Sequence, residues 1–257
     1  VNSRRNRIQI AGLKIVGNRW DENGLRTVTD SLLTEDQRGI DERFALGVIS
    51  NKTDPVKYNP PVQPNVQNDI SEKEQSLLVD YENIQPGHSW RIRKRFAGTG
   101  LDFSTYRDLN MFVHTEQINP DLEYFFRIAF DSLTFYEIEI PLTTEYFSDA
   151  NWARVLVDLA DFSDLKYQPT DSVVVGTAQD MADPNRSYTI RMLGRPNQPS
   201  LFNVRFLYAG MRNNSDSDAT GEIWINDIYL GNRRRDVDTA QRVTGSVGRE
   251  AATILPL

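Results

Sequence analysis

Cysteine and histidine are scarce in this sequence. Its 257 residues include no cysteine and only two histidines, His88 and His114. The lack of cysteine excludes disulfides, thiolate nucleophiles, iron–sulfur clusters and cysteine-ligated zinc sites. Neither histidine has companions at metal-ligand spacing, and Ser89 beside His88 lacks the Gly-x-Ser-x-Gly motif of a nucleophile elbow. We therefore expect ordinary polar roles for both histidines, in a turn and at a strand end.

Long apolar runs and an excess of positive charge are also missing. The mean hydropathy is −0.52 and no run of about 18 apolar residues occurs, so we expect no membrane-spanning helix in this segment. The 29 basic and 36 acidic side chains give a net charge of −7, which argues against general binding of nucleic acid or anionic membranes. The sequence opens with Val1-Asn2-Ser3, without an initiator Met or an apolar signal core, and we expect it to be part of a longer protein.

Period-two alternation of apolar and polar residues is common along the chain. Hydrophobic residues make up 39% of the sequence, which is enough to close a sizeable core. Runs rich in Val, Ile, Phe, Tyr and Trp are separated by Asp, Asn, Gly and Pro, a pattern typical of β-strands. The predicted strands are Gln75–Tyr81, Ser89–Phe96, Leu109–Thr115, Glu123–Phe130, Thr134–Leu142, Ala153–Leu159, Tyr188–Leu193, Asn203–Met211 and Glu222–Leu230, with a short further strand at Val173–Val175.

The alternation gives these strands one apolar and one charged face. Ile138 and Ile140, for example, alternate with Glu137 and Glu139. We expect the charged face to be solvated. Eight or more such strands, joined by irregular loops, predict an all-β fold: an antiparallel jelly-roll β-sandwich, galactose-binding-like, with extended arms.

Composition divides the chain into four parts. Residues 1–50 contain N-terminal strands and an arm, and they are either part of this unit or the end of a preceding module. Residues 51–74, rich in Pro and Asn, read as a linker or wrapping arm. We place the sandwich at 75–232 and a polar tail or linker at 233–257. Residues 8–19 resemble 223–233, so the first strand either belongs to a preceding sandwich or completes this one.

Several runs resemble, in order, the repeated soluble modules of the SprA/Sov family, the giant outer-membrane translocon of the type 9 secretion and gliding-motility system. The runs are Leu13–Trp20, Tyr58–Pro61, Glu74–Leu78, Tyr106–His114, Arg127–Asp131, Phe135–Leu142 and Gly221–Leu230.

The resemblance implies a soluble, non-enzymatic module attached to a very large barrel that exports folded proteins. Such a module would act as a scaffold or protein-contact surface at the outer membrane or cell surface. Its partners would be other parts of the same chain and secretion-system proteins, with no nucleic acid and no direct membrane span.

The runs that begin at Tyr106 and Glu222 are also similar to galactose-binding-like carbohydrate modules. The alternative function is therefore a carbohydrate-binding module for cell-surface or extracellular polysaccharide, although many unrelated binders share this fold. Such a module needs exposed rings. Trp90 alternates in phase with Ile92 and should point inward, whereas Trp152 follows a turn and is the best candidate for an exposed ring. Tyr106 is a further candidate, and Trp224 could face either way.

Glu137 and Glu139 lie two residues apart on one strand, so both carboxylates project from one face. A carboxylate pair could serve a glycoside hydrolase if it sat in a cleft. We favour a solvated strand face instead, with cross-strand ion pairs to an arginine stripe as an easy alternative. The stripe, which could also bind an acidic partner or a polysaccharide, consists of Arg91, Arg93 and Arg95.

No catalytic or cofactor-binding residue is predicted, and a structural calcium ion is the one cofactor considered. Asp80, Glu82 and Asp227 could supply oxygen ligands near the terminal strands. The oxygen-rich loop 213–218 lacks the spacing of an EF-hand and is better explained as a turn.

Overall fold

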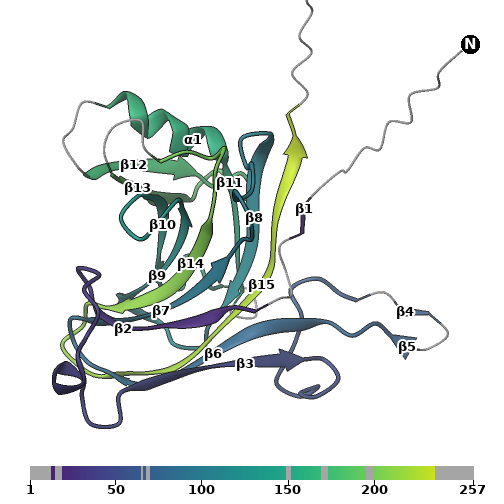
Figure 1. Ribbon diagram of the computed structural model, residues 1–257. Helices are drawn as coiled ribbons and strands as arrows, with labels where there is room; N and C mark the ends of the chain where they lie inside the picture. The colour runs from purple at the N-terminus through teal and green to yellow at the C-terminus, as the bar shows by residue number, and fades with distance from the viewer. Residues whose placement is uncertain are drawn as a thin grey trace, which may run out of the picture.

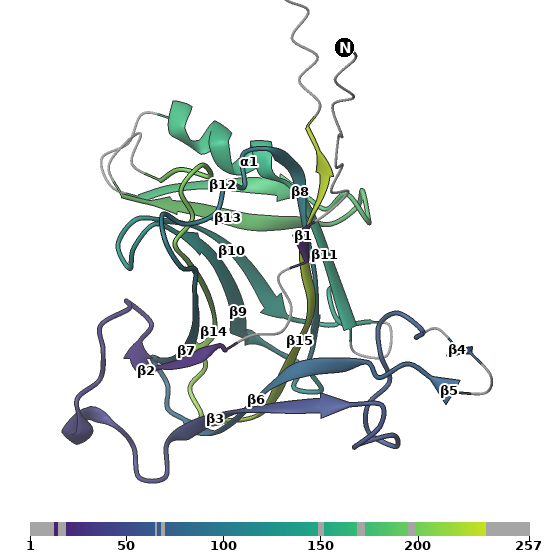
Figure 2. The same ribbon diagram turned by 45° about the vertical axis from the view of Figure 1, so that its right-hand side comes forward.

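The computed structural model describes residues 13–14, 19–64, 66–67, 70–148, 152–168, 173–194 and 199–234. Within these residues the chain forms two antiparallel sheets that lie in separate layers (Figures 1 and 2). The six-stranded sheet has the order β11-β8-β15-β6-β3, with β1 also paired to β15. The seven-stranded sheet has the order β12-β13-β10-β9-β14-β7-β2. The all-β sandwich prediction is confirmed.

The elements have the following bounds. The strands of the two sheets are β1 (Leu13–Lys14), β2 (Asp21–Thr27), β3 (Arg43–Ser50), β6 (Gln75–Ile84), β7 (His88–Arg95), β8 (Tyr106–His114), β9 (Asn119–Ala129), β10 (Phe135–Leu142), β11 (Trp152–Asp158), β12 (Val173–Gln179), β13 (Ser187–Leu193), β14 (Phe206–Asn213) and β15 (Ala219–Arg233). A small hairpin pairs β4 (Val66–Gln67) with β5 (Ile70–Ser71), and the helical elements are η1 (Glu35–Gln37), α1 (Leu159–Asp164) and η2 (Leu165–Tyr167).

Alternation along the strands builds the core between the two sheets. Tyr81 of β6 contributes from the six-stranded sheet, and Trp90 and Ile92 of β7 contribute from the seven-stranded sheet, all without solvent exposure. The prediction that Trp90 points inward is confirmed. At one side of the sandwich, α1 begins at Leu159 and is capped by Asp158, whose carboxylate accepts a hydrogen bond from the backbone N–H of Ala160 at 2.8 Å.

Strands that precede residue 51 complete both sheets. β2 pairs with β7 at the edge of the seven-stranded sheet, and β3 pairs with β6 at the edge of the six-stranded sheet. The two sheets thus draw on residues that the sequence assigned to an N-terminal segment. β1 pairs with the last part of β15, the strand that it resembles in sequence. Most of residues 8–19, and the tail from residue 235 onward, lie outside the described residues.

Candidate functional site

The outer face of the seven-stranded sheet, which points away from the core, carries side chains aligned across the strands. Glu137 of β10 lies between Arg127 of β9 and Arg191 of β13 in the register of the sheet. Tyr208 and Arg93 continue this row on β14 and β7. Directly opposed side chains on one face of an antiparallel pair are close enough to interact. The register therefore places opposite charges side by side.

Four arginines and four carboxylates on this face form a connected set of ion pairs, which we call the charge lattice. Arg212 lies 2.7 Å from Glu137 and 3.1 Å from Glu139, and Arg191 lies 2.6 Å from Glu139. The set consists of Arg91, Arg127, Arg191, Arg212, Asp30, Glu123, Glu137 and Glu139. Arg26 lies 3.9 Å from Asp30 and adds one further positive charge at the edge of the lattice.

Asp30 joins the lattice from the turn that follows β2. This residue has a positive φ of 76°, which Asp tolerates better than most residues. Its carboxylate lies 2.8 Å from Arg91 and 2.9 Å from Arg127. Asn23 Oδ1 accepts a further hydrogen bond from Arg91 at 2.8 Å. β2 and its turn thus cover the guanidinium of Arg91.

Burial and neighbouring charges act in opposite directions on the lattice. Burial alone would raise the pKa of Glu137, but the guanidiniums of Arg127 and Arg212 outweigh it and hold that pKa below its ordinary value. Burial lowers the pKa of Arg91 to about 10, against the attraction of Asp30. The pKa of Arg212 is raised because Glu137 and Glu123 more than offset its burial.

Aromatic rings pack between the guanidiniums of the lattice. The ring centroid of Phe125 lies 4.7 Å from Arg127 and 4.4 Å from Arg212, and Tyr208 lies 4.5 Å from Arg91. These are cation–π distances. The rings of Phe125 and Tyr208 are buried, so the rings and guanidiniums fill this face among themselves.

The expected solvation of this face is wrong for its centre. Arg91 and Glu137 are each only 1% exposed, and Glu139 is also buried. The physical reason is that long arginine side chains lie across neighbouring strands and cover the carboxylates. The ion-pair partners of Glu137 and Glu139 are Arg127, Arg191 and Arg212, rather than the predicted stripe.

The stripe itself divides into three different environments. Arg91 is buried in the lattice, Arg93 is 3.7 Å from Asp21 and about one-third exposed, and Arg95 is exposed at the end of β7. Along the outer face of β7, solvent exposure therefore increases from Arg91 to Arg95.

Glu139 should make the stability of the chain depend on pH. Burial, Glu123 and Glu137 raise its pKa from 4.5 to about 7, against the attraction of Arg212 and Arg191. In the unfolded chain the carboxyl ionises near its ordinary pKa, so the folded state loses relative stability as the pH rises from about 5 to about 8. Glu139→Gln should remove this loss.

Urea denaturation of the chain and of Glu139→Gln, each at about pH 5 and about pH 8, measures the effect. The free energy of unfolding of the unaltered chain should decline relative to that of the variant as the pH rises. Glu82→Gln is the matched control, because Glu82 lies in a solvent-exposed ion pair with Arg43. If the free energies of unfolding of the chain and of Glu139→Gln differ by the same amount at the two pH values, the raised pKa of Glu139 is contradicted.

The outer face of the six-stranded sheet carries an aromatic cluster covered by residues 51–64, which we call the arm. Tyr58 of the arm packs against Trp152 and Trp224, with ring centroids 6.4 and 5.8 Å away. His114 stacks on Trp224 with ring centroids 3.9 Å apart and an interplanar angle of 19°. The side chain of Trp152 donates a hydrogen bond to the Asn59 carbonyl at 2.9 Å. These contacts tie the arm to β8, β11 and β15.

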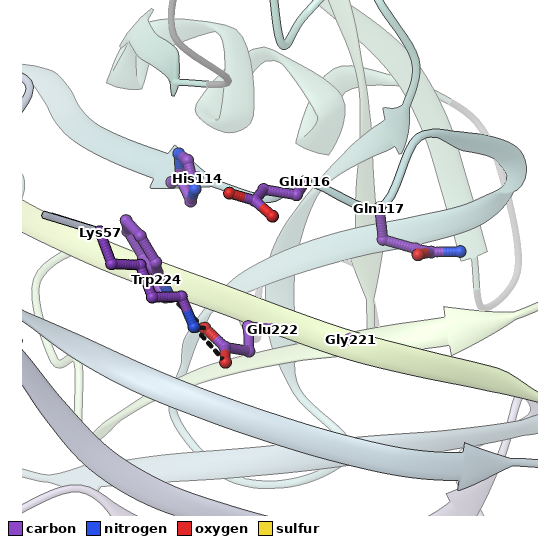
Figure 3. Close-up of a pocket in the computed structure, with 7 residues that line it drawn as sticks. All are labelled: Lys57, His114, Glu116, Gln117, Gly221, Glu222 and Trp224. Carbon is purple, nitrogen blue, oxygen red and sulfur yellow. Dashed lines mark hydrogen bonds and ion pairs between the residues drawn. The ribbon is translucent and has the colours of Figure 1, made fainter. Parts of the chain in front are cut away.

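A small polar pocket of about 330 Å³ opens beside this cluster. Lys57 lies 2.6 and 2.7 Å from the two carboxylate oxygens of Glu222 and 5.8 Å from the Trp224 ring centroid (Figure 3). Glu116 and Gln117 line it after the end of β8. The arm thus supplies the cation that neutralises Glu222 at this pocket.

Trp152 is 8% exposed, so the expectation that it is an exposed ring is wrong. The reason is that the arm covers it. Trp224 faces the same outer side of the sheet and is buried under the arm as well. Tyr106 is half-buried and packs against the core. The rings that the sequence offered for stacking on a ligand are therefore covered wholly or in part.

Tyr58 should be the residue that holds the arm in place. Its ring is buried and its hydroxyl lies 2.8 Å from Ser76 Oγ. Tyr58→Ala removes both contacts, so trypsin should cut at Lys52 and Lys57 at least roughly tenfold faster, because cleavage follows the population of the open arm. Tyr167→Ala is the matched control, since Tyr167 is 86% exposed. Unchanged cleavage of Tyr58→Ala would disprove this role.

The calcium candidates do not converge in the structure. Asp80 is opposite Glu222 in the register of β6 and β15, whereas Asp227 lies five residues further along β15, roughly 17 Å away. The Glu82 carboxylate pairs with Arg43. Among the described residues, no group of three or more His, Cys, Asp or Glu side chains could hold a metal ion.

The loop at 213–218 and His88 have structural partners. Asn213 is buried and donates hydrogen bonds to the carbonyls of Ile84 at 2.7 Å and Ser217 at 2.8 Å, which closes the turn between β14 and β15. His88 Nδ1 lies 2.9 Å from Glu42 Oε1 and connects β7 to the residue before β3.

Several residues that shape both outer faces escaped the sequence interpretation. Arg127 interrupts an apolar run and Arg212 follows one, so a charge at a strand position within apolar surroundings was the available signal. Tyr58 stood in a Pro-rich segment as the only aromatic residue between Phe44 and Tyr81. No feature of the sequence around Asp30 indicated its role. That role depends on the turn after β2, which places the Asp30 carboxylate between Arg91 and Arg127.

Fold and faces together define a β-sandwich in which the chain's own side chains cover the charge lattice on one outer face and the aromatic cluster on the other. Its sequence matches the SprA_N family, described as motility related/secretion protein, over residues 8–247. The chain belongs to this family. No curated protein matches it. Among the residues that the structure describes, no helix is long and apolar enough to cross a membrane.

Comparison with solved structures found two carbohydrate-binding modules and an agarase among the similar chains. The family 11 carbohydrate-binding module of the cellulase Lic26A-Cel5E of Clostridium thermocellum shares 13% identity and a TM-score of 0.44, covering 89% of this chain and 99% of that chain. An exo-β-agarase shares 11% identity and a TM-score of 0.41, over 79% of this chain and 24% of that chain. The mannan-recognising module TmCBM27 shares 15% identity and a TM-score of 0.26, over 75% and 99% of the two chains.

Proposed function

We propose that this chain is a non-enzymatic module of an outer-membrane type 9 protein-secretion translocon, where it serves as a scaffold and protein-contact surface. The observation that carries the proposal is the family match, which spans nearly the whole chain. In this role the module sits at the outer membrane or cell surface, and its partners are other parts of the same large chain and secretion-system proteins.

The charge lattice supports a scaffold rather than a hydrolase. A glycoside hydrolase needs two carboxylates that face a cleft and reach the substrate. Here Glu137 is buried between Arg127 and Arg212, and Glu139 is buried against Arg191 and Arg212. Paired in this way, the carboxylates join β9, β10, β13 and β14 into one rigid face. A rigid face suits a module that positions its neighbours.

The covered rings favour the scaffold over the alternative of a carbohydrate-binding module. Exposed aromatic rings are the usual platform for a sugar, and the three rings of the cluster, Tyr58, Trp152 and Trp224, are buried. The arm supplies one of these rings and covers the other two. We expect the folded chain to give no signal on an array of bacterial and plant glycans, and a specific glycan signal would favour the alternative.

Removal of the module from the parent protein tests the proposal. In a bacterium with type 9 secretion, an in-frame deletion of residues 19–234 should abolish release of cargo proteins with the C-terminal signal and should stop gliding. The amount of the shortened translocon in the outer membrane is the control, measured by immunoblot. Normal secretion and gliding by cells with the shortened protein would disprove the proposed function.

A further inference from the structure

An apolar row crosses the outer face of the seven-stranded sheet at the end next to the turn between β9 and β10. The sheet register aligns five apolar residues from five neighbouring strands. They are Val173 of β12, Leu193 of β13, Phe135 of β10, Ala129 of β9 and Phe206 of β14. Val173 is 43% exposed, Leu193 and Phe206 are half-buried, and the two central residues are buried. The row lies next to the charge lattice on the same face. On β10 and β9, for example, Phe135 and Ala129 of the row are two residues away from Glu137 and Arg127 of the lattice.

Two large apolar side chains project at the same end of the sheet. Leu133 in the β9–β10 turn is 71% exposed, and Phe202 in the segment before β14 is 70% exposed. The segment lies along the turn, because Tyr136 donates a hydrogen bond to the Pro199 carbonyl at 3.0 Å and the Arg205 N–H donates to the Ala129 carbonyl at 2.9 Å. Single exposed apolar residues are ordinary, but a contiguous set marks an interaction surface.

Arg95 and Arg205 give this end of the sheet a local positive charge. Arg95 is opposite Phe206 in the register, and the Arg205 guanidinium lies 4.5 Å from the Phe130 ring centroid. Both are exposed, and within the described part of the chain neither forms an ion pair with a carboxylate. The carboxylate of Asp131 accepts a hydrogen bond from the N–H of Leu133 within its own turn.

We propose that the solvent-accessible members of the apolar row, Val173, Leu193 and Phe206, together with Leu133, Phe202, Arg95 and Arg205, bind an extended segment of a partner polypeptide that has apolar side chains followed by carboxylates. The row spans four inter-strand spacings of about 4.8 Å, roughly 19 Å, which about six extended residues would cover. The acidic end of the segment lies at Arg95 and Arg205. The inference rests on the proposed function, since it names the partner chemistry of a protein-contact surface.

Charge complementarity selects this partner over others. The chain as a whole carries a net charge of −7, so an acidic segment is repelled elsewhere and attracted at this end. Arginine and aromatic residues are enriched at protein interfaces, and a desolvated guanidinium binds a carboxylate strongly. A basic segment would instead leave two arginines facing like charges.

Fluorescence anisotropy with the complete 257-residue chain tests the proposal. The probe is a labelled peptide of about twelve residues, with Val, Leu and Phe in its first half and Asp and Glu in its second half. The peptide should bind, and Arg95→Glu with Arg205→Glu should weaken binding at least tenfold and reduce its dependence on salt. Leu133→Ser with Phe202→Ser should weaken binding as well.

Matched controls distinguish binding at this site from nonspecific binding of the peptide. Arg38→Glu and Val56→Ser alter an exposed arginine and a fully exposed valine elsewhere on the chain and should leave binding unchanged. A peptide with Lys in place of Asp and Glu should not bind. Thermal unfolding checks that every variant is folded.

Three outcomes would overturn the proposal: absence of binding, equal binding of the lysine peptide, or equal binding by the Arg95→Glu and Arg205→Glu variant. None of these outcomes affects the proposed function, which is tested separately by deleting the module and measuring secretion. Normal secretion by the deleted protein would instead refute the proposed function, whatever the peptide does.

Discussion

Glu137→Ala should lower the free energy of unfolding by about 3–5 kcal/mol, because it leaves charged guanidiniums buried without their partner. Glu137 is 1% exposed, and its carboxylate accepts hydrogen bonds from both Arg127 and Arg212. Burial of an ion pair adds little stability by itself, but breaking one exposes the full cost of desolvating the charge that remains. Urea denaturation followed by circular dichroism measures the change.

Glu82→Ala is the matched control for this prediction. Glu82 also pairs with an arginine across two strands, but its side chain is 36% exposed and that of Arg43 is 61% exposed. Water solvates both groups after the pair is broken, so the expected loss is below about 1 kcal/mol. Similar losses for Glu82→Ala and Glu137→Ala would show that the lattice is not desolvated and would contradict the assignment.

Gly210→Ala should destabilise the chain by about 3 kcal/mol through overpacking of the same face. A Cβ atom on Gly210 would lie 2.7 Å from Phe125 Cε1 and closer still to the Trp90 carbonyl oxygen. Phe125 is held on its other sides by Arg127 and Arg212, so its ring has no room to move away. Thermal and urea denaturation should both report the loss.

Gly47→Ala provides the comparison within the other sheet. A Cβ atom at Gly47 would meet Leu78 Cδ2 at 3.4 Å, an ordinary contact distance. This substitution should change stability by less than about 1 kcal/mol, in the stabilising direction, because alanine restricts the unfolded chain. If Gly210→Ala were equally neutral, Phe125 would not lie against this strand as described.

Local alternation was sufficient to predict the sandwich and the inward direction of its core residues. The phase of Trp90 with Ile92 placed both in the core, and the structure agrees. Alternation identifies which residues share a face, however, and not what covers that face. Glu137 and Arg91 were correctly assigned to the side away from the core, but their burial depends on Arg212 and Asp30, which come from distant parts of the sequence.

The same reasoning explains the outcome for Trp152. The residue follows a turn, which is commonly a solvated position, and nothing near it in the sequence indicates a covering segment. Tyr58 and Asn59 cover it from more than ninety residues away. Contacts of this kind are set by the path of the arm over the six-stranded sheet. They become visible only when the strands are placed side by side.

Secretion by cells whose translocon carries Glu139→Gln tests the central claim, a non-enzymatic scaffold, most directly. This variant removes the carboxylate with the most strongly raised pKa on the face and keeps the shape of its side chain. The scaffold account predicts that cells with Glu139→Gln release type 9 cargo at the rate of unaltered cells. A loss of secretion with a folded and correctly inserted translocon would show that secretion requires the Glu139 carboxyl itself, and it would contradict the account.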